Sequence, residues 1–370
     1  MRPADKRITR LSLRRLFCYV LILMALPSCS GTRDNAAGPQ KQATVTLMVT
    51  PGGLGDNSYN DAAAEGIFAF AGETGTKLRL LFPQSMDEAG EMYRQWMTDN
   101  AGQDSAVFIF GSSAYEGLAQ STDNTPFTSH HSGSSRILLF ESDAQIDGVS
   151  TVMVSRYGVS YLAGVLSQRM DALILAAAKG YPTIENSIAG FMDARKIYAG
   201  EYLGDSCLTT LHYLADGEEG FTMPDSAYHF LAWWEDSADF LGFDDLVFPL
   251  LGGSETGVVR YLNDDYFSEA LMVGMDVDHS GLSSRIPFSV VIRIGDVLKQ
   301  YLNDWLAGRE WPASQSFGMK DGATDIVFTP NFAEHLVITG MRPYSVPDWF
   351  KWLYDDYKDE AIRKEEAYEK

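Results

Sequence analysis

A glycine-rich turn at residues 52–60 separates a predicted strand from a predicted helix and limits the fold more than any other stretch of the chain. Ahead of it, residues 43–50 alternate between polar and apolar side chains and then become apolar, which is typical of a strand. Behind it, residues 61–70 are rich in alanine and favour a helix. This order indicates an α/β domain, in which ligands bind at the carboxyl ends of the strands.

The turn itself has two interpretations. Glycine, asparagine and aspartate are the usual turn residues, so spacing alone favours a plain connection with a helix N-cap. The turn lacks both the G-x-G-x-x-G spacing of a dinucleotide site and the G-K-S/T of a P-loop. However, it carries four chemically different side chains: Asp56, Ser58, Tyr59 and Asn60. A carboxylate, a hydroxyl, an aromatic ring and an amide together suit a neutral ligand with a flat ring and several hydroxyls.

Short apolar runs alternate with helical segments along the rest of the chain. Strands are predicted at residues 77–82, 105–110, 136–140, 149–154, 187–191, 245–251, 270–275 and 325–328. Helices are predicted at residues 86–100, 115–119, 157–179, 197–214, 256–262 and 289–306, whereas residues 221–242 fit a strand and a helix equally well. Nearly continuous apolar strands are typical of parallel sheets covered on both faces, so the sequence predicts an α/β fold with parallel sheets.

Residues 1–28 have the pattern of an export signal, with a basic start followed by a short apolar run at residues 17–26. That run is too short to span a bilayer as a stable anchor. It ends in Leu-Pro-Ser before Cys29, which resembles the lipobox of bacterial lipoproteins. The resemblance implies a lipidated Cys29, a flexible tether over residues 29–43 and a place in the cell envelope facing the periplasm or the exterior. The alternative is an ordinary signal peptide with an incidental cysteine.

Charge and cysteine content exclude several classes of function. The formal net charge of −21 opposes binding to the nucleic-acid backbone. With Cys18 removed and Cys29 lipidated, only Cys207 remains, so no intrachain disulfide is expected, and its apolar neighbours predict a buried, inert thiol. The adjacent histidines at 130 and 131 lie in a loop without a metal-ligand pattern. We therefore expect no metal and no cofactor.

Four segments together carry a family resemblance. They are DNSYN at residues 56–60, GVSYLAG at 158–164, GGSETGV at 252–258 and VGMDVDH at 273–279. Their sequence and order over residues 44–308 resemble the basic membrane protein family, which comprises substrate-binding lipoproteins of ABC transporters and includes purine-nucleoside receptors. Each segment alone is a weak signal, because turns of glycine and aspartate are common.

The resemblance implies a type I periplasmic-binding-protein fold in which two Rossmann-like lobes close over a ligand in the cleft between them. The expected first lobe comprises residues 44–155 and 285–318, and the expected second lobe comprises residues 156–284 and 319–347. A charged helix at residues 348–370 follows. The implied ligand is a nucleoside, the implied partner is an ABC-transporter permease, and the protein is expected to be a monomer.

The resemblance also implies roles for individual residues. Tyr59 stands where the family stacks an aromatic ring on the base, and Asn60 stands where an amide bonds the base. Asp276 stands where a carboxylate accepts hydrogen bonds from the ribose hydroxyls. Glu141 stands near a base-contacting aspartate, and Gly253 lies on the turn that approaches the sugar. The full set of predicted ligand-binding residues is Asp56, Ser58, Tyr59, Asn60, Ser112, Glu141, Gly253 and Asp276.

Two departures from the family pattern concern the ligand. Ile292 stands where the family commonly has a lysine, and the neighbouring Arg293 is not expected to replace it. The family's second stacking aromatic residue has no clear counterpart, and Trp233 and Trp234 are more easily explained as core residues. A nucleoside remains the expected ligand, with another flat or polyhydroxylated molecule left open.

The expected function is therefore capture of a small molecule without catalysis. One alternative is an envelope hydrolase acting on nucleosides or sugars in the same cleft, with Glu141 or Asp276 as its acid or base. Another is a surface lipoprotein that keeps the fold but has lost its ligand.

Overall fold

The computed structural model describes residues 43–50, 53–55, 59–127, 136–199, 201–202, 205–238, 245–264, 270–330, 332 and 346–370. The predicted signal and tether, Cys29, Asp56, Ser58 and the two loop histidines lie outside the described residues. Residues 42–370 form one compact unit. Within the described part, none of the helices has the length and apolar character needed to cross a membrane.

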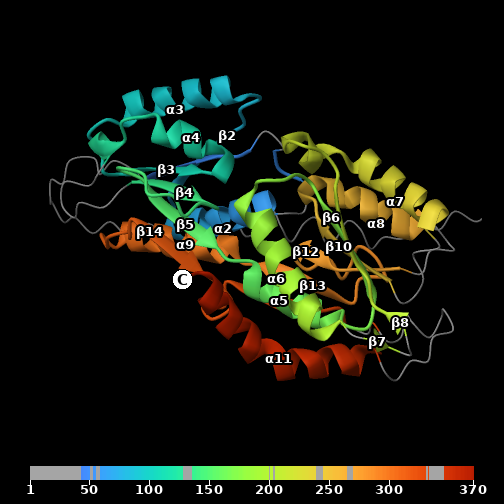
Figure 1. Ribbon diagram of the computed structural model, residues 1–370. Helices are drawn as coiled ribbons and strands as arrows, with labels where there is room; N and C mark the ends of the chain where they lie inside the picture. The colour runs from blue at the N-terminus through green and yellow to red at the C-terminus, as the bar shows by residue number, and fades with distance from the viewer. Residues whose placement is uncertain are drawn as a thin grey trace, which may run out of the picture. The chain divides into compact units, whose positions relative to one another are not determined.

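A six-stranded parallel sheet organises the first half of this unit (Figure 1). Its strands are β1 (Thr44–Met48), β2 (Lys77–Leu81), β3 (Ala106–Phe110), β4 (Ile137–Phe140), β5 (Ser150–Val154) and β14 (Ser314–Phe317). They lie in the order β14-β5-β4-β3-β1-β2, and every pairing is parallel. The last strand comes from far along the chain, and we call this sheet with its covering helices the first lobe.

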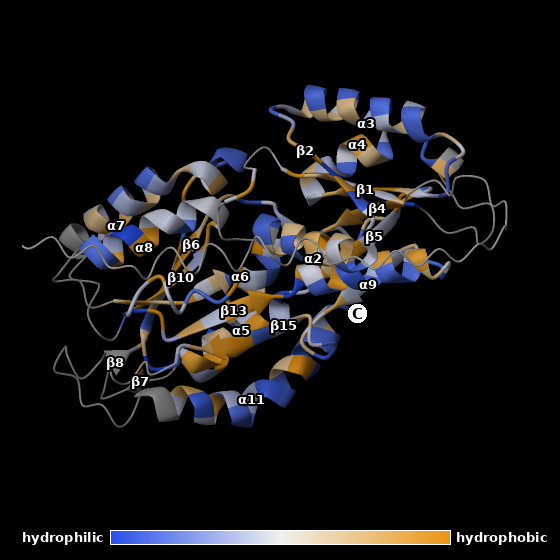
Figure 2. Cartoon of the chain, turned by 180° about the vertical axis from the view of Figure 1, so that it is seen from behind, coloured by the Kyte–Doolittle hydropathy of each residue, from blue (hydrophilic) through white to orange (hydrophobic). Residues whose placement is uncertain are grey.

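Helices cover both faces of the first sheet. They are α2 (Tyr59–Thr74) and α9 (Ile294–Leu306) on one face, and α3 (Met86–Asn100) and α4 (Glu116–Gln120) on the other. Along β3, Val107 and Ile109 pack into the cluster that contains α2 and α9, whereas Phe108 and Phe110 pack against α3. Both faces of the strand are buried, as its continuous apolar run predicted. Figure 2 shows the strands of the sheet as mostly apolar and the helices that cover them as amphipathic.

The second half of the unit repeats the same strand order. Its strands are β6 (Asp171–Ala176), β9 (Thr209–Tyr213), β10 (Asp245–Leu250), β11 (Leu271–Met272), β12 (Gly274–Asp276), β13 (Phe288–Ile292) and β15 (Thr324–Phe328). The amide of Val273 donates to the carbonyl of Val247 at 3.0 Å, so β11 and β12 are two halves of one strand. The order is therefore β9-β6-β10-β11/β12-β13-β15, with only β15 antiparallel.

The helices of this second lobe are α5 (Tyr157–Leu166) and α6 (Pro182–Tyr198) on one face and α7 (Pro224–Ala238) and α8 (Glu255–Asp264) on the other. Glycines let backbones touch in equivalent helix pairs of the two lobes. A Cβ atom on Gly66 of α2 would lie 2.2 Å from the carbonyl oxygen of Gly295 in α9. A Cβ atom on Gly190 of α6 would lie 2.1 Å from the carbonyl oxygen of Tyr157 in α5.

The chain passes between the lobes three times, at residues 155–156, 293 and 318–323. The last helix, α11 (Val346–Tyr368), packs on α5 and reaches two of these passages. Its Glu365 is 3% exposed and accepts hydrogen bonds from the amides of Gly158 (3.0 Å) and Met319 (2.8 Å). Residues 285–292 were expected in the first lobe, but β13 pairs with β12 and β15, which places them in the second.

Four predicted elements are wrong in whole or in part. The predicted helix 157–179 is α5 followed by β6, and the predicted helix 289–306 is β13 followed by α9. The predicted strand 187–191 lies inside α6, and the predicted helix 197–214 contains β9. Every residue of α5 is buried, and periodicity cannot separate a fully buried helix from a fully buried strand. The ambiguous residues 221–242 contain α7.

Candidate functional site

A cavity of about 450 Å³ lies between the lobes, where the carboxyl ends of several strands of both sheets meet. Thr50 follows β1, Ser112 follows β3, and Asp276 ends β12. This is the place at which open α/β sheets bind ligands, because the strand ends leave loops and helix N-termini facing outward.

The first lobe gives the cavity a polar wall. Asn60 on α2 is 6% exposed, and its Nδ2 donates to Oγ1 of Thr50 at 2.9 Å. Ser112 lies at the end of β3, where its hydroxyl caps a short 3-10 turn by accepting from the amide of Ala114 at 3.1 Å. Ser113 also lines the cavity. Apart from Ala114, the described first-lobe residues that line the cavity are polar.

The second lobe adds an aromatic wall that the sequence analysis missed. Tyr181 and Phe221 both line the cavity, with ring centroids 5.1 Å apart and an interplanar angle of 81°. Phe221 lies in an irregular stretch just before α7, where no periodic pattern marks it. Neither Trp233 nor Trp234 lines the cavity.

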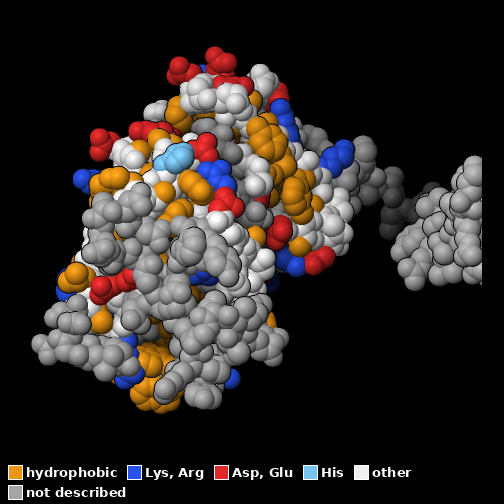
Figure 3. Space-filling view, turned by 90° about the vertical axis from the view of Figure 1, so that its right-hand side faces the viewer, with side chains coloured by type: hydrophobic (Ala, Val, Ile, Leu, Met, Phe, Trp, Pro, Cys, Tyr) orange, Lys and Arg blue, Asp and Glu red, His pale blue; other side chains and the backbone are white. Residues whose placement is uncertain are grey.

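The expectation that both tryptophans belong to the core is wrong for Trp233, which is 60% exposed on α7. Trp234 is half-buried and packs on the cluster between α7 and the sheet. Figure 3 views the side of the molecule on which α7 lies, where hydrophobic side chains are interspersed with acidic and basic ones.

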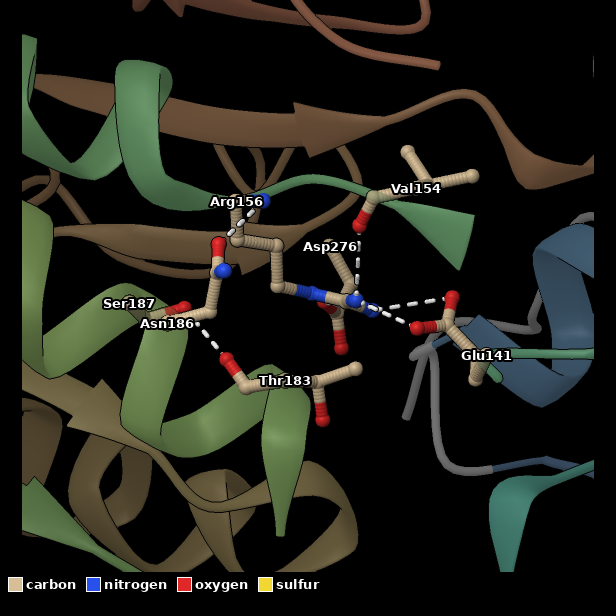
Figure 4. A network of polar contacts seen from close by, with 7 residues as sticks. All are labelled: Glu141, Val154, Arg156, Thr183, Asn186, Ser187 and Asp276. Atoms are coloured by element: carbon tan, nitrogen blue, oxygen red, sulfur yellow. Dashed lines mark hydrogen bonds and ion pairs between the residues drawn. The ribbon is translucent and has the colours of Figure 1, made fainter. Parts of the chain in front are cut away.

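A buried ion pair lies at the centre of the site (Figure 4). Nη1 and Nη2 of Arg156 donate to the two carboxylate oxygens of Glu141, at 2.6 and 3.3 Å. Nη2 also lies 4.0 Å from Oδ1 of Asp276. The backbone amide of Arg156 donates to Oδ1 of Asn186 on α6 at 2.9 Å. Arg156 lies on the first passage between the lobes, so it links that passage to carboxylates of both lobes.

The environment of Glu141 opposes its charge in two ways. Burial raises the pKa of Glu141, and the nearby carboxylate of Asp276 raises it further. The guanidinium of Arg156 lowers this pKa through charge and hydrogen bonding, which partly offsets the shift. Both Glu141 oxygens are occupied by Arg156, so Glu141 lines the cavity as one half of a pair.

Glu141 and Asp276 occupy equivalent places in the two lobes. Each lies at the end of the fourth strand of its lobe in chain order, and each has a left-handed backbone, with φ of 63° and 67°. This conformation is uncommon for residues other than glycine and is found often at functional sites. The two bends therefore aim a carboxylate from each lobe at Arg156.

A second glutamate supports each bend. At the start of α4, Glu116 accepts a hydrogen bond from the hydroxyl of Ser142 at 2.9 Å. At the start of α8, Glu255 accepts from the amide of Met275 at 3.4 Å and from Nδ1 of His279 at 2.8 Å. Burial raises the pKa of Glu255 to about 7, against the lowering effect of His279. This pair lies behind Asp276 and does not line the cavity.

Five of the eight predicted ligand residues line the cavity: Asn60, Ser112, Glu141, Gly253 and Asp276. Tyr59 begins α2, but its side chain lies outside the described structure, as do Asp56 and Ser58. The sequence analysis missed Arg156, Tyr181 and Phe221. Arg156 lies two residues before the GVSYLAG segment, yet nothing in its spacing indicated a partner.

The remaining predicted residues take other positions. Ile292 is 1% exposed and belongs to β13 rather than to a helix, and Arg293 donates from Nη1 to the carbonyl of Gly322 at 2.7 Å. Cys207 is half-buried and lies outside any helix, contrary to expectation. No group of three or more histidine, cysteine, aspartate or glutamate side chains in the described part could hold a metal ion.

No protein-family model matches the chain, and no curated protein is significantly similar to it in sequence. Solved structures are similar in fold. An ABC transporter system solute-binding protein from Aeropyrum pernix K1 is 16% identical, with 88% of this chain and 90% of that chain covered and a TM-score of 0.63. The periplasmic binding protein of the arabinose ABC transporter from Shewanella sp. ANA-3, bound to L-arabinofuranose, is 11% identical, with 80% and 95% covered and a TM-score of 0.56.

A transcriptional activator of the comK gene from Bacillus halodurans is also similar, at 16% identity, with 85% and 97% covered and a TM-score of 0.57. Identities this low show a shared fold and nothing more. The chain therefore has the α/β fold of periplasmic solute-binding proteins, which confirms the predicted fold class. Because transcription regulators share this fold, the function has to be argued from the cavity itself.

Proposed function

We propose that this protein is the solute-binding component of an ABC transporter and that it captures a hydroxylated, nucleoside-like molecule between its lobes. The observation that carries this proposal is the cavity, which combines a polar wall from one lobe with an aromatic wall from the other. A sugar ring needs acceptors and donors around its hydroxyls, and a flat ring needs an aromatic face.

Each wall has a role in binding. The carboxylate of Asp276 accepts hydrogen bonds from neighbouring hydroxyls, while Asn60 and Ser112 bond other polar edges of the ligand. Phe221 packs against its flat face, and the family resemblance supports stacking of Tyr59 on the base. The three passages between the lobes act as the hinge on which they close, and closure excludes water from these contacts.

The finer parts of the proposal come from sequence resemblance. The four segments that resemble the basic membrane protein family support a nucleoside and a permease partner, and the fold neighbours that bind sugars support a hydroxylated ring. We further propose that a lipid on Cys29 holds the protein in the cell envelope and that it works there as a monomer without catalysing a reaction.

A thermal-shift screen of the purified protein tests this function. The panel comprises adenosine, uridine, inosine, ribose, arabinose and glucose, and a ligand at about 100 times its Kd stabilises the fold by about 2.7 kcal/mol. We expect a shift with at least one compound, clearly reduced in Asp276→Ala and in Phe221→Ala but kept in Glu310→Gln, an exposed change outside the cavity. If the two cavity variants keep the full shift, the ligand binds elsewhere. If no compound produces a shift, the proposed ligand class is wrong.

A further inference from the structure

The charges that line the cavity are strongly unequal. Among the described residues that line it, the only cation is the guanidinium of Arg156. Four carboxylates line the same cavity: Glu141, Glu218, Glu219 and Asp276. Two of them come from the ends of strands deep in the site, and the other two come from the start of a 3-10 turn, Glu218–Thr222, that leads to α7.

Arg156 is not available to balance this charge. Its two terminal nitrogens already bind both oxygens of Glu141, and the pair is buried. Asp276 is 4.0 Å from the same guanidinium, which is an ion pair without a close hydrogen bond. The carboxylates of Asp276, Glu218 and Glu219 therefore give the cavity a negative potential, and an anionic ligand would meet no free cation on the described walls.

The acidic turn and the aromatic wall are part of the same surface. Phe221 lies two residues after Glu219, and its ring meets that of Tyr181 nearly edge to face. Burial, and after it the carboxylate of Glu218, raises the pKa of Tyr181 to about 12, which places Glu218 beside the phenol. Glu218 and Glu219 are both exposed, so this acidic and aromatic surface lies at the mouth of the cavity.

We propose that the ligand carries a positive charge, which is held at the mouth of the cavity by Glu218, Glu219 and the rings of Tyr181 and Phe221. The ligand class is a hydroxylated ring with a protonated amine, an amino sugar or an amino nucleoside. This inference rests on the proposed function and deepens it. A cation is attracted to the face of an aromatic ring. Nearby carboxylates add an electrostatic attraction, which becomes weaker as the salt concentration rises.

The test compares ligands that share a ring scaffold and carry a neutral, a cationic or an anionic substituent. Two series serve: glucose, glucosamine and glucuronate; and adenosine, 5′-amino-5′-deoxyadenosine and adenosine 5′-monophosphate. Binding to the full chain is measured by isothermal titration calorimetry at a pH where the amines are protonated, at low and at high salt. In at least one series we expect the amine to bind about tenfold more tightly than the neutral parent, with the anion weakest. High salt should narrow that preference.

Two variants test which carboxylates bind the positive charge of the ligand. The double variant Glu218→Gln/Glu219→Gln should lose the preference for the amine and keep the affinity for the neutral parent, because both side chains keep their size and lose only their charge. Glu310→Gln, which also removes one exposed carboxylate, should keep the preference.

The outcomes separate the two proposals. If the neutral parent binds as tightly as the amine or more tightly, the inference is overturned and the proposed function stands. If the amine is preferred but the double variant keeps that preference, the assignment to Glu218 and Glu219 is overturned. If no member of either series binds, the inference falls together with the proposed ligand class.

Discussion

The two lobes have one strand order but supply opposite surfaces to the cavity. The described first-lobe wall is polar, with Thr50, Asn60 and Ser112, and contains no aromatic ring in the described residues. The second-lobe wall holds Tyr181 and Phe221 together with most of the carboxylates. A shared scaffold therefore does not fix what each half binds. The described first-lobe side chains offer hydrogen-bonding groups, whereas the second lobe adds two aromatic rings to its own polar groups.

The two lobes are most alike at the end of the fourth strand. Glu141 and Asp276 have the same left-handed backbone bend, and a glutamate at the start of the preceding helix of the same lobe supports each bend. The two carboxylates differ in their contacts with Arg156, which binds both oxygens of Glu141 but only approaches Asp276. The carboxylate at this position is thus hydrogen-bonded to Arg156 through both oxygens in the first lobe, whereas in the second lobe it lies 4.0 Å from the same guanidinium.

The largest expected effect on stability comes from removing Arg156, the partner of Glu141. Arg156→Ala leaves the buried carboxylate of Glu141 without its partner, and we expect a loss of about 3–5 kcal/mol in the free energy of unfolding, measured by urea denaturation. The double variant Arg156→Met/Glu141→Leu removes both charges and should recover most of that loss. A cost below about 1 kcal/mol for Arg156→Ala would show that the pair contributes little.

A pH series tests the bend of the second lobe. Glu255 has a pKa of about 7 in the fold against an ordinary 4.5, so the native state binds the extra proton between these values. Its contribution to stability is fully present below pH 4.5 and is lost as the pH rises to about 7, on the order of 2–3 kcal/mol. Denaturation at several pH values should show this slope flattened in Glu255→Gln.

Asp276 and Glu141 should differ in what their loss affects. Asp276→Ala should weaken ligand binding by about 1.5–3 kcal/mol, because it removes a charged acceptor of hydrogen bonds, and should leave the unfolding free energy nearly unchanged. Calorimetry and urea denaturation of the same sample provide both values. A large loss of stability with unchanged affinity would reverse the roles assigned to the two carboxylates.

The close helix contacts at Gly66 and Gly190 are a feature that the two lobes share, and substitutions there test that likeness. Gly66→Ala and Gly190→Ala each place a methyl group within about 2 Å of a backbone oxygen of the partner helix. We expect each to cost about 1–3 kcal/mol, and the two costs to be similar, because equivalent helix pairs must move apart. Thermal denaturation measures both, with Gly72→Ala as a control, since a Cβ atom there meets nothing within 4 Å.

The sequence predicted residues 43–154 of the first lobe well, missed its strand β14, and predicted the second lobe poorly, for a physical reason. Helix α3 is amphipathic and has a clear N-cap at Ser85, so its period separates it from the apolar strands around it. Helix α5 is buried on all sides and is followed after four residues by the equally apolar β6. Hydrophobicity alone cannot divide such a stretch.

The site was predictable where a residue ends a strand. Ser112, Glu141 and Asp276 follow apolar runs, and the carboxyl ends of parallel strands meet at one edge. Arg156 and Phe221 lie outside that rule. The importance of Arg156 depends on a carboxylate brought near it by folding, and Phe221 lies in a segment without a repeating pattern.

The return of the chain to complete the first sheet has a consequence for synthesis. Strand β14 and helix α9, which close the first lobe, span residues 294–317, after all strands of the second lobe except β15. A chain that emerges from its amino end, from a ribosome or across a membrane, cannot complete the first lobe until nearly the whole second lobe has emerged. Until then the outer edge of β5 and the apolar face that α9 covers stay open to water. The two halves must therefore mature together, and a nascent chain stalled after β5 is the species most in need of a chaperone.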